Sequence, residues 1–273
     1  MAYETGDPKQ LHPPLIIDRL MSMIPIGTHS IGFTTTNTIL DLYSAPSSAG
    51  FIEALREESQ RVYAEGDHVW SKHAVSKLYR TDSAIKESMR VSAFGTVTLH
   101  RCVDEPYPEL PASIINVSQV SAKEGLDIDN IHIPEGTRLG VPVAIIQRDE
   151  AYYPSAATYD ALRFSRQWER DDVNKKSAAT TRRPDFFRTT SQGRFHLPTP
   201  SDTFLAFGYG KNTCPGRFYA SLVMKLMISY LVQHYDVEYT SKRPAMSSLV
   251  EMKLPDRGTQ IRIRRRKPDL STD

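Results

Sequence analysis

A glycine-rich run that ends in a single cysteine, Phe207–Gly216, constrains this chain more than any other segment. Pro215 follows Cys214 directly, and proline suits the first turn of a helix because the N–H that it lacks would have no partner there. The N–H groups of the next residues then point back toward Cys214, together with the positive end of the helix dipole. Such surroundings stabilise a thiolate, which acts as a nucleophile or as a soft metal ligand.

The residues around the cysteine indicate what a thiolate would bind there. Phe207, Gly210 and Gly216 leave room for a large flat group pressed against the backbone, where a Cβ atom would intrude. A haem with an axial cysteine satisfies all of these features. The alternative is a buried cysteine that happens to stand at the start of a helix.

The same run resembles the haem-binding signature of the cytochromes P450, Phe-x-x-Gly-x-x-x-Cys-x-Gly. Its four fixed residues fall at Phe207, Gly210, Cys214 and Gly216. The resemblance implies a mainly α fold with small β-sheets, and haem b whose iron is held by the thiolate of Cys214.

A second signature of the family, Glu-x-x-Arg, is matched by Glu87 and Arg90. Taken alone, a carboxylate and a guanidinium three residues apart on a helix usually form a solvated surface pair. The family adds an arginine downstream, and Tyr159–Phe164 matches that segment, with Arg163 as the third member. Because a planar guanidinium bridges a carboxylate bidentately, the resemblance implies a buried network that fixes the segment leading to the haem loop.

The helix that handles dioxygen in the family departs from the usual pattern here. The sequence predicts a long helix over 14–43, in whose middle the family carries a small residue followed by an acid and a threonine. In the register of fungal members this segment is Gly27–Ile31, so His29 replaces the acid and Ser30 replaces the threonine. Histidine relays protons near neutral pH, and serine offers the same hydroxyl group as threonine.

A second register of this helix starts from Gly32 and assigns the hydroxyl to Thr34 or Thr35. Both threonines are also explained as helix residues whose hydroxyl groups bond back to the preceding turn. Pro25 removes a helix hydrogen bond just before Gly27 and therefore favours a local opening, which a site that admits water and oxygen would need.

Haem propionates need cations, and two places are candidates. His100 and Arg101 follow the Glu87 helix where the family commonly has a propionate partner, and arginine can bind a carboxylate with its fork. Two residues before the cysteine, where the family usually has arginine or histidine, this chain has Asn212 beside Lys211. Asparagine donates a hydrogen bond but carries no charge, so this departure weakens the expected hold on haem.

Composition favours one globular domain over 1–273, with 40% hydrophobic residues and a formal net charge of +2, and gives no indication of nucleic-acid binding. Only Cys102 and Cys214 are cysteines, and a ligand role for Cys214 argues against a disulfide. The sequence has no apolar stretch of about eighteen residues that would span a membrane. Since full-length relatives carry an endoplasmic-reticulum anchor and further N-terminal helices, we expect an intracellular, N-terminally truncated domain.

The remaining elements are predicted from periodicity and from helix start and stop signals. We expect helices over 47–64 and 72–79, a helix capped by Asp82 that carries Glu87 to about Ala93, strands over 96–103 and 137–145, and a helix over 216–235. The segment Ile133–Thr137 resembles the turn that joins two strands of the family's small sheet. The apolar residues of that last helix predict its core side: Phe218, Leu222, Val223, Leu226, Met227, Tyr230 and Leu231.

The resemblance implies a monooxygenase that oxidises a small hydrophobic molecule with O2 in fungal secondary metabolism, using electrons from an NADPH-dependent P450 reductase. The alternative is a non-catalytic remnant with impaired haem binding. His29, Ser30 and Asn212 favour that alternative, because each departs from the pattern of the family.

Overall fold

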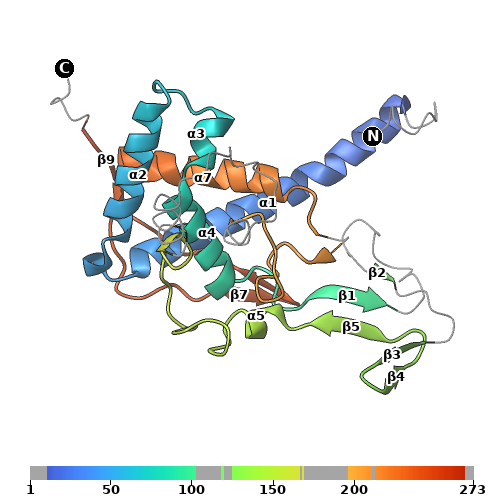
Figure 1. Ribbon diagram of the computed structural model, residues 1–273. Coiled ribbons are helices and arrows are strands. Elements are labelled where there is room, and N and C mark those ends of the chain that lie inside the picture. The colour runs from blue at the N-terminus through green and yellow to red at the C-terminus, as the bar shows by residue number, and fades with distance from the viewer. Residues whose placement is uncertain are drawn as a thin grey trace, which may run out of the picture.

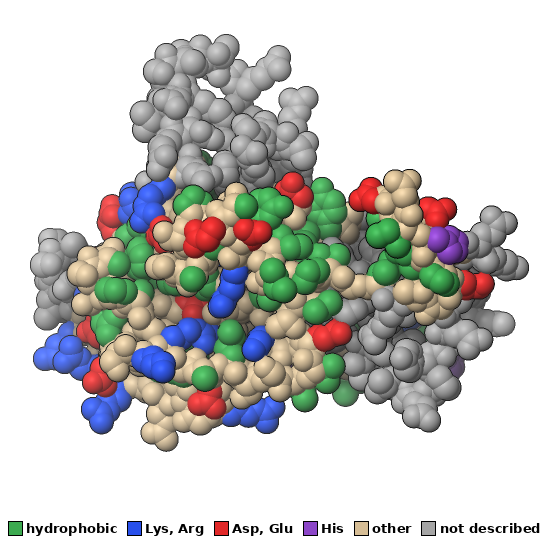
Figure 2. All heavy atoms as spheres, turned by 90° about the horizontal axis from the view of Figure 1, so that it is seen from below, with side chains coloured by type: hydrophobic (Ala, Val, Ile, Leu, Met, Phe, Trp, Pro, Cys, Tyr) green, Lys and Arg blue, Asp and Glu red, His purple; other side chains and the backbone are tan. Residues whose placement is uncertain are grey.

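The computed structural model describes residues 11–102, 118–119, 125–166, 168, 196–210 and 213–267. In this part of the chain the helices form one body, and the sheet around β1 lies to one side of it (Figure 1). Hydrophobic side chains and charges of both signs are interspersed on the face shown in Figure 2. No helix in the described ranges is long and apolar enough to cross a membrane.

The longest helix, α1, spans Pro13–Ser44 and agrees with the predicted bounds. Pro25 lies within it, but the helix continues on both sides, so the expected opening is not seen. The N-terminal half of α1 extends beyond the helical body (Figure 1), and Ile17 and Ile24 are 57% and 59% exposed there. The C-terminal half is buried, although many of its buried residues are polar: Thr34, Thr35, Asn37, Thr38 and Asp41.

Three helices follow: α2 (Phe51–Glu65), preceded by the 3-10 helix η2 (Ser47–Ala49), then α3 (Lys72–Ser76) and α4 (Tyr79–Val91). The prediction that Asp82 caps α4 is wrong, because Asp82 lies inside the first turn. The cap comes from Glu58 on α2, whose Oε1 accepts from the N–H groups of Tyr79 (2.8 Å) and Arg80 (2.7 Å). These N–H groups have no partner within their own helix, so the carboxylate joins α2 to α4.

Helix α7 spans Arg217–His234 and packs against α1, α2 and α4. Its buried face differs from the predicted one, since Phe218 and Tyr230 are 41% and 52% exposed. Lys225 turns inward instead, and its Nζ lies 3.3 Å from Oδ2 of the buried Asp82. An ion pair between helices therefore overrides the apolar pattern. The buried residues of α7 are Ser221, Met224, Lys225, Ile228, Ser229 and Val232.

The main sheet has the order β2-β1-β5. β1 (Thr98–Cys102) pairs antiparallel with β5 (Arg138–Val141) and parallel with β2 (Ser118–Gln119). The strand predicted over 137–145 ends at Val141, and α5 (Val143–Ile146) follows. Pro142 stands between them and cannot donate to the strand ladder, which explains the early end.

The described residues also form three two-stranded sheets: β3 (Leu126–Ile128) with β4 (Ile131–Ile133), β6 (Tyr235–Val237) with β9 (Ile263–Arg265), and β7 (Ser247–Leu249) with β8 (Met252–Leu254). The turn predicted at Ile133–Thr137 thus connects strands of different sheets. The β7–β8 hairpin is fastened to the segment after α4, because Lys253 N donates to the Phe94 carbonyl over 2.8 Å.

Candidate functional site

The loop that contains Cys214 is a tight turn held by its own backbone. Cys214 N donates to the Phe207 carbonyl over 2.8 Å, and Thr213 N donates to the Gly210 carbonyl over 3.1 Å. Gly208 and Gly210 have φ angles of 76° and 68°, which residues with a side chain rarely adopt. The two glycines therefore allow the chain to turn back between Phe207 and Cys214.

The thiol of Cys214 is free and partly exposed, three residues before α7 begins. Arg217 Nη1 donates to the Cys214 carbonyl over 2.8 Å and fixes the junction with the helix. A Cβ atom added at Gly216 would touch Cys214 Sγ at 3.9 Å, so glycine keeps this side of the sulfur open. The sulfur is thus accessible at the positive end of a helix, as a thiolate ligand requires.

Glu87, Arg90 and Arg163 meet in one buried network. Arg90 Nε and Nη2 donate to the two carboxylate oxygens of Glu87, each over 2.8 Å, and Arg163 Nε donates to Oε1 over 2.9 Å. The side chains of Glu87 and Arg90 are fully buried, and that of Arg163 is 13% exposed. The solvated surface pair that the sequence alone allows is therefore excluded.

The remaining N–H groups of the two arginines hold the backbone that follows α5. Arg90 Nη1 donates to the carbonyls of Gln147 (2.6 Å) and Ala156 (2.7 Å). Arg163 Nη1 donates to the Pro154 carbonyl over 2.7 Å. These buried carbonyl groups would otherwise lack partners, so the network fixes the path of the chain between α5 and Arg163.

Helix α4 also holds the segment that leads to the Cys214 loop. Lys86 Nζ, which is fully buried, donates to the carbonyls of His196 (2.9 Å) and Thr199 (3.4 Å). Asp82 Oδ1 accepts from Leu197 N over 2.7 Å. Lys86 and Asp82 thus fix the segment 196–199, which precedes the Cys214 loop.

Gln147 connects the arginine network to the loop itself. Its side chain is fully buried, its Oε1 accepts from Leu205 N over 2.9 Å, and its carbonyl accepts from Arg90. Leu205 lies two residues before Phe207, so the contact places the start of the loop. No sequence pattern marks this glutamine.

His29 lies on the exposed side of α1, and its Nδ1 is 2.8 Å from the Pro25 carbonyl. A carbonyl oxygen only accepts, so Nδ1 carries the proton and Nε2 of the neutral ring keeps its lone pair. The ring also contacts Phe33, which in turn stacks on Phe94 with ring centroids 6.0 Å apart. Ser30 beside it is half-buried.

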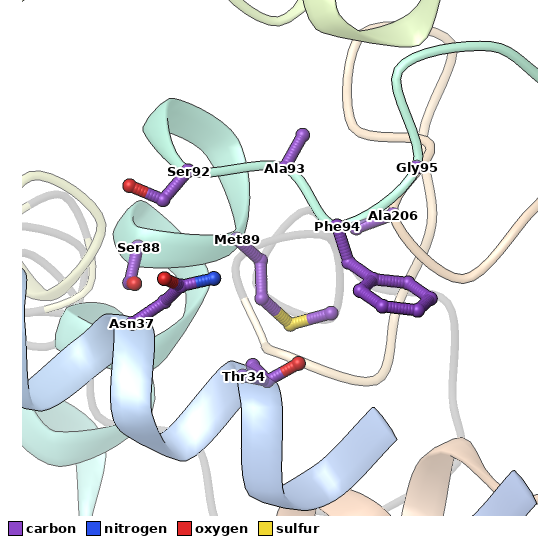
Figure 3. A pocket seen from close by; sticks show the side chains of 9 residues that line it. All are labelled: Thr34, Asn37, Ser88, Met89, Ser92, Ala93, Phe94, Gly95 and Ala206. Atoms are coloured by element: carbon purple, nitrogen blue, oxygen red, sulfur yellow. The ribbon is translucent and has the colours of Figure 1, made fainter. Parts of the chain in front are cut away.

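The alternative hydroxyl groups are more deeply buried. Thr34 and Thr35 are 8% and 3% exposed, and Thr34 lines a small cavity between α1 and α4 (Figure 3). Of the expected propionate partners, His100 and Arg101 lie in β1, where only their backbone is described. Lys211 and Asn212 lie outside the described residues.

A sequence model of the family Cytochrome P450 matches residues 111–261 of this chain. The match covers more than half of the chain. The chain belongs to the cytochrome P450 family. Its mainly α architecture with small sheets agrees with that membership, so the predicted fold class is confirmed.

Several fungal P450s are similar along most of the chain. Cytochrome P450 monooxygenase gloP of Glarea lozoyensis is 35% identical over 97% of this chain and 45% of the relative. Cytochrome P450 monooxygenase htyF of Aspergillus rugulosus is 35% identical over 86% of this chain and 31% of the relative. Cytochrome P450 monooxygenase okaG of Penicillium ochrochloron is 31% identical over 97% of this chain and 47% of the relative. The chain thus spans less than half of the length of these curated relatives.

The residues present fit the haem that the P450 family implies. Cys214 offers one soft ligand, and no cluster of three or more His, Cys, Asp or Glu residues suited to a metal occurs in the ranges that the structure covers. Haem iron needs no such cluster, because a single cysteine thiolate of the protein can hold it. Glycine at 208 and 210 also leaves these two positions of the turn, both with positive φ angles, without a Cβ atom.

Proposed function

We propose that this protein is a haem-thiolate monooxygenase in which Cys214 is the axial ligand of haem b. The observation that carries the proposal is an accessible free thiol at the start of α7, on a loop that the buried Glu87 network holds through Gln147. When bound, the haem supplies the redox chemistry that activates dioxygen and oxidises a C–H bond.

The proposal assigns a task to each group of residues. The thiolate of Cys214 would hold the haem iron, while Phe207, Gly210 and Gly216 would leave space for the ring. Glu87, Arg90 and Arg163 position the loop through the carbonyl groups they hold, and touch no reacting atom. His100 and Arg101 would bind the haem propionates.

In this proposal His29 and Ser30 of α1 transfer protons. His29 Nδ1 is already engaged with the Pro25 carbonyl, so Nε2 is the atom that takes up a proton from solvent and passes it on. The Ser30 hydroxyl both donates and accepts hydrogen bonds, so it would receive that proton from His29 and hold it at its Oγ. This assignment rests on the register in which Ser30 stands for the family's threonine.

Electrons would come from an NADPH-dependent P450 reductase, and the substrate would be a small hydrophobic compound of fungal secondary metabolism. The support is that the similar proteins are named cytochrome P450 monooxygenases and come from fungi. A non-catalytic remnant with impaired haem binding is the second candidate, favoured by the unusual pair His29 and Ser30.

The absorption spectrum of the reduced, carbon-monoxide-bound protein, expressed with haem supplied, decides between the two. A red-shifted Soret band shows a folded site with a thiolate ligand. A protein that is soluble and folded by circular dichroism but takes up no haem, or gives only the blue-shifted band, supports the remnant.

A further inference from the structure

A small cavity of about 20 Å³ lies between α1 and α4, beneath the segment that follows α4 (Figure 3). One water molecule needs roughly 10–15 Å³ of such space and two to four polar partners. The cavity therefore has room for one water and for nothing larger. Its lining residues are Thr34, Asn37, Ser88, Met89, Ser92, Ala93, Phe94, Gly95 and Ala206.

Asn37 presents an unpaired donor to this cavity. The residue is 1% exposed, and its Nδ2 has no hydrogen-bond partner among the residues that the structure describes. The orientation of the amide is fixed from the other side, because Oδ1 accepts from Arg243 Nη2 over 2.9 Å. A flipped amide would set Nδ2 against the guanidinium, donor against donor. Figure 3 shows the amide nitrogen of Asn37 turned toward Met89, across the cavity.

Helix α4 supplies hydroxyl acceptors to the lining of this cavity. Ser88 Oγ and Ser92 Oγ donate to the two carboxylate oxygens of Asp41, over 2.6 Å and 3.0 Å. Both serine protons are thus committed, while each oxygen keeps lone pairs. A group that accepts from Asn37 and donates to a serine hydroxyl completes the hydrogen bonding, and water does both.

We propose that this cavity is a binding site for one internal water molecule, which accepts from Asn37 Nδ2 and donates to the hydroxyl of Ser88 or Ser92. The water links α1 to α4 beside the Asp41 and Arg243 contacts. It also extends a polar line on one face of α1, where Ser30, Thr34, Asn37 and Asp41 recur at helical spacing. The site does not depend on the proposed monooxygenase function.

A crystal structure of the unmodified chain, at a resolution where ordered waters are visible, tests the site directly. We expect one water oxygen within about 2.7–3.2 Å of Asn37 Nδ2 and of a serine hydroxyl. The proposal is overturned if Met89 or Phe94 fills the space, if Nδ2 pairs with a protein atom, or if the cavity shows no density while other internal waters are seen.

Magnetic relaxation dispersion of water oxygen, which counts long-lived internal waters, gives a second test in solution. Asn37→Leu removes the donor and fills space, so this variant should hold one long-lived water fewer than the unchanged protein. Thr36→Val is the control, because Thr36 is exposed on the same helix and lies outside the cavity. An equal count in Asn37→Leu and the unchanged protein contradicts the site.

Discussion

Arg163 Nε donates to Glu87 Oε1 over 2.9 Å and so joins two residues that are 76 positions apart in the sequence. The same carboxylate oxygen accepts from Arg90 Nη2 and from Asp160 N. Glu87 is fully buried, so its charge is compensated inside the protein by these groups. The contact fixes α4 against the chain that follows α5.

Glu87→Ala should strongly destabilise the fold. The change leaves the fully buried guanidinium of Arg90 without its counter-charge, and breaking a buried pair in this way costs about 3–5 kcal/mol. A domain has only about 5–15 kcal/mol of stability in total. The measurements are the yield of soluble protein and its circular dichroism, both made before any haem is added.

Glu65→Ala is the matched control for that experiment. Glu65 pairs with Arg61 at 2.9 Å on the surface of α2, with the two side chains 43% and 51% exposed. A solvent-exposed pair of this kind contributes little to stability because water screens the two charges, so the variant should fold normally. If Glu87→Ala is as soluble and as stable as Glu65→Ala, the buried network does not support the fold.

The parts that sequence predicted best are those whose chemistry allows few alternatives. A cysteine followed by Pro215 predicts a helix start, and α7 begins at Arg217. Glu87 and Arg90 stand at a spacing that places them on one side of a helix, and the resemblance supplied Arg163. The structure brings these three side chains together.

The errors came from contacts between distant segments. Aspartate is a residue type that commonly caps helices, yet Asp82 pairs with Lys225 on α7. Glu58 on α2 caps α4 instead. A hydrophobic pattern counts apolar residues only, so it missed that α7 turns Lys225 inward. Gln147 was also missed, because its role depends on a hydrogen bond to Leu205, 58 residues away, which no local sequence pattern predicts.

Cys214→Ala should abolish thiolate ligation of iron and leave the fold intact. The side chain is partly exposed, and the hydrogen bonds of the loop come from the backbone of Cys214, which alanine retains. We expect an unchanged circular dichroism spectrum and no red-shifted Soret band in the reduced carbon-monoxide complex. A thiolate-type spectrum in this variant would show that the iron ligand is another residue.

Ser30→Ala should uncouple oxygen consumption from product formation. Ser30 is half-buried, and in the proposed mechanism its hydroxyl holds the proton that His29 would pass on, so the alanine variant lacks this group. The measurement is hydrogen peroxide released per NADPH oxidised, with a reductase supplied, and we expect it to rise. Thr35→Val, which removes the hydroxyl of the alternative register, should leave the ratio unchanged. The opposite result for the two variants would assign the role to Thr35.

Lys86 should make stability depend on pH above neutrality. Burial lowers the pKa of Lys86 from 10.5 to about 7, although the carboxylate of Asp82 acts in the opposite direction. Between these two pH values the unfolded chain binds a proton that the folded protein does not, so stability increases as pH rises through this window and is lost as pH falls toward 7. The neutral amine still has two N–H groups for the carbonyls of His196 and Thr199.

Lys86→Met removes the titrating group and keeps an unbranched side chain of similar length. The free energy of unfolding of the unchanged protein, minus that of the variant, should rise with pH from about 7 to 10, by at most about 1.4 kcal/mol per pH unit. Both proteins otherwise have the same ionisable side chains, so the difference between the two free energies isolates the contribution of Lys86. Lys86→Leu is the control and must give the same dependence of this difference on pH, because neither leucine nor methionine titrates. A loss of packing contacts that differs between the two variants would shift their curves only by a constant amount. Curves that run parallel to that of the unchanged protein would show that Lys86 keeps its charge in the folded state across this range.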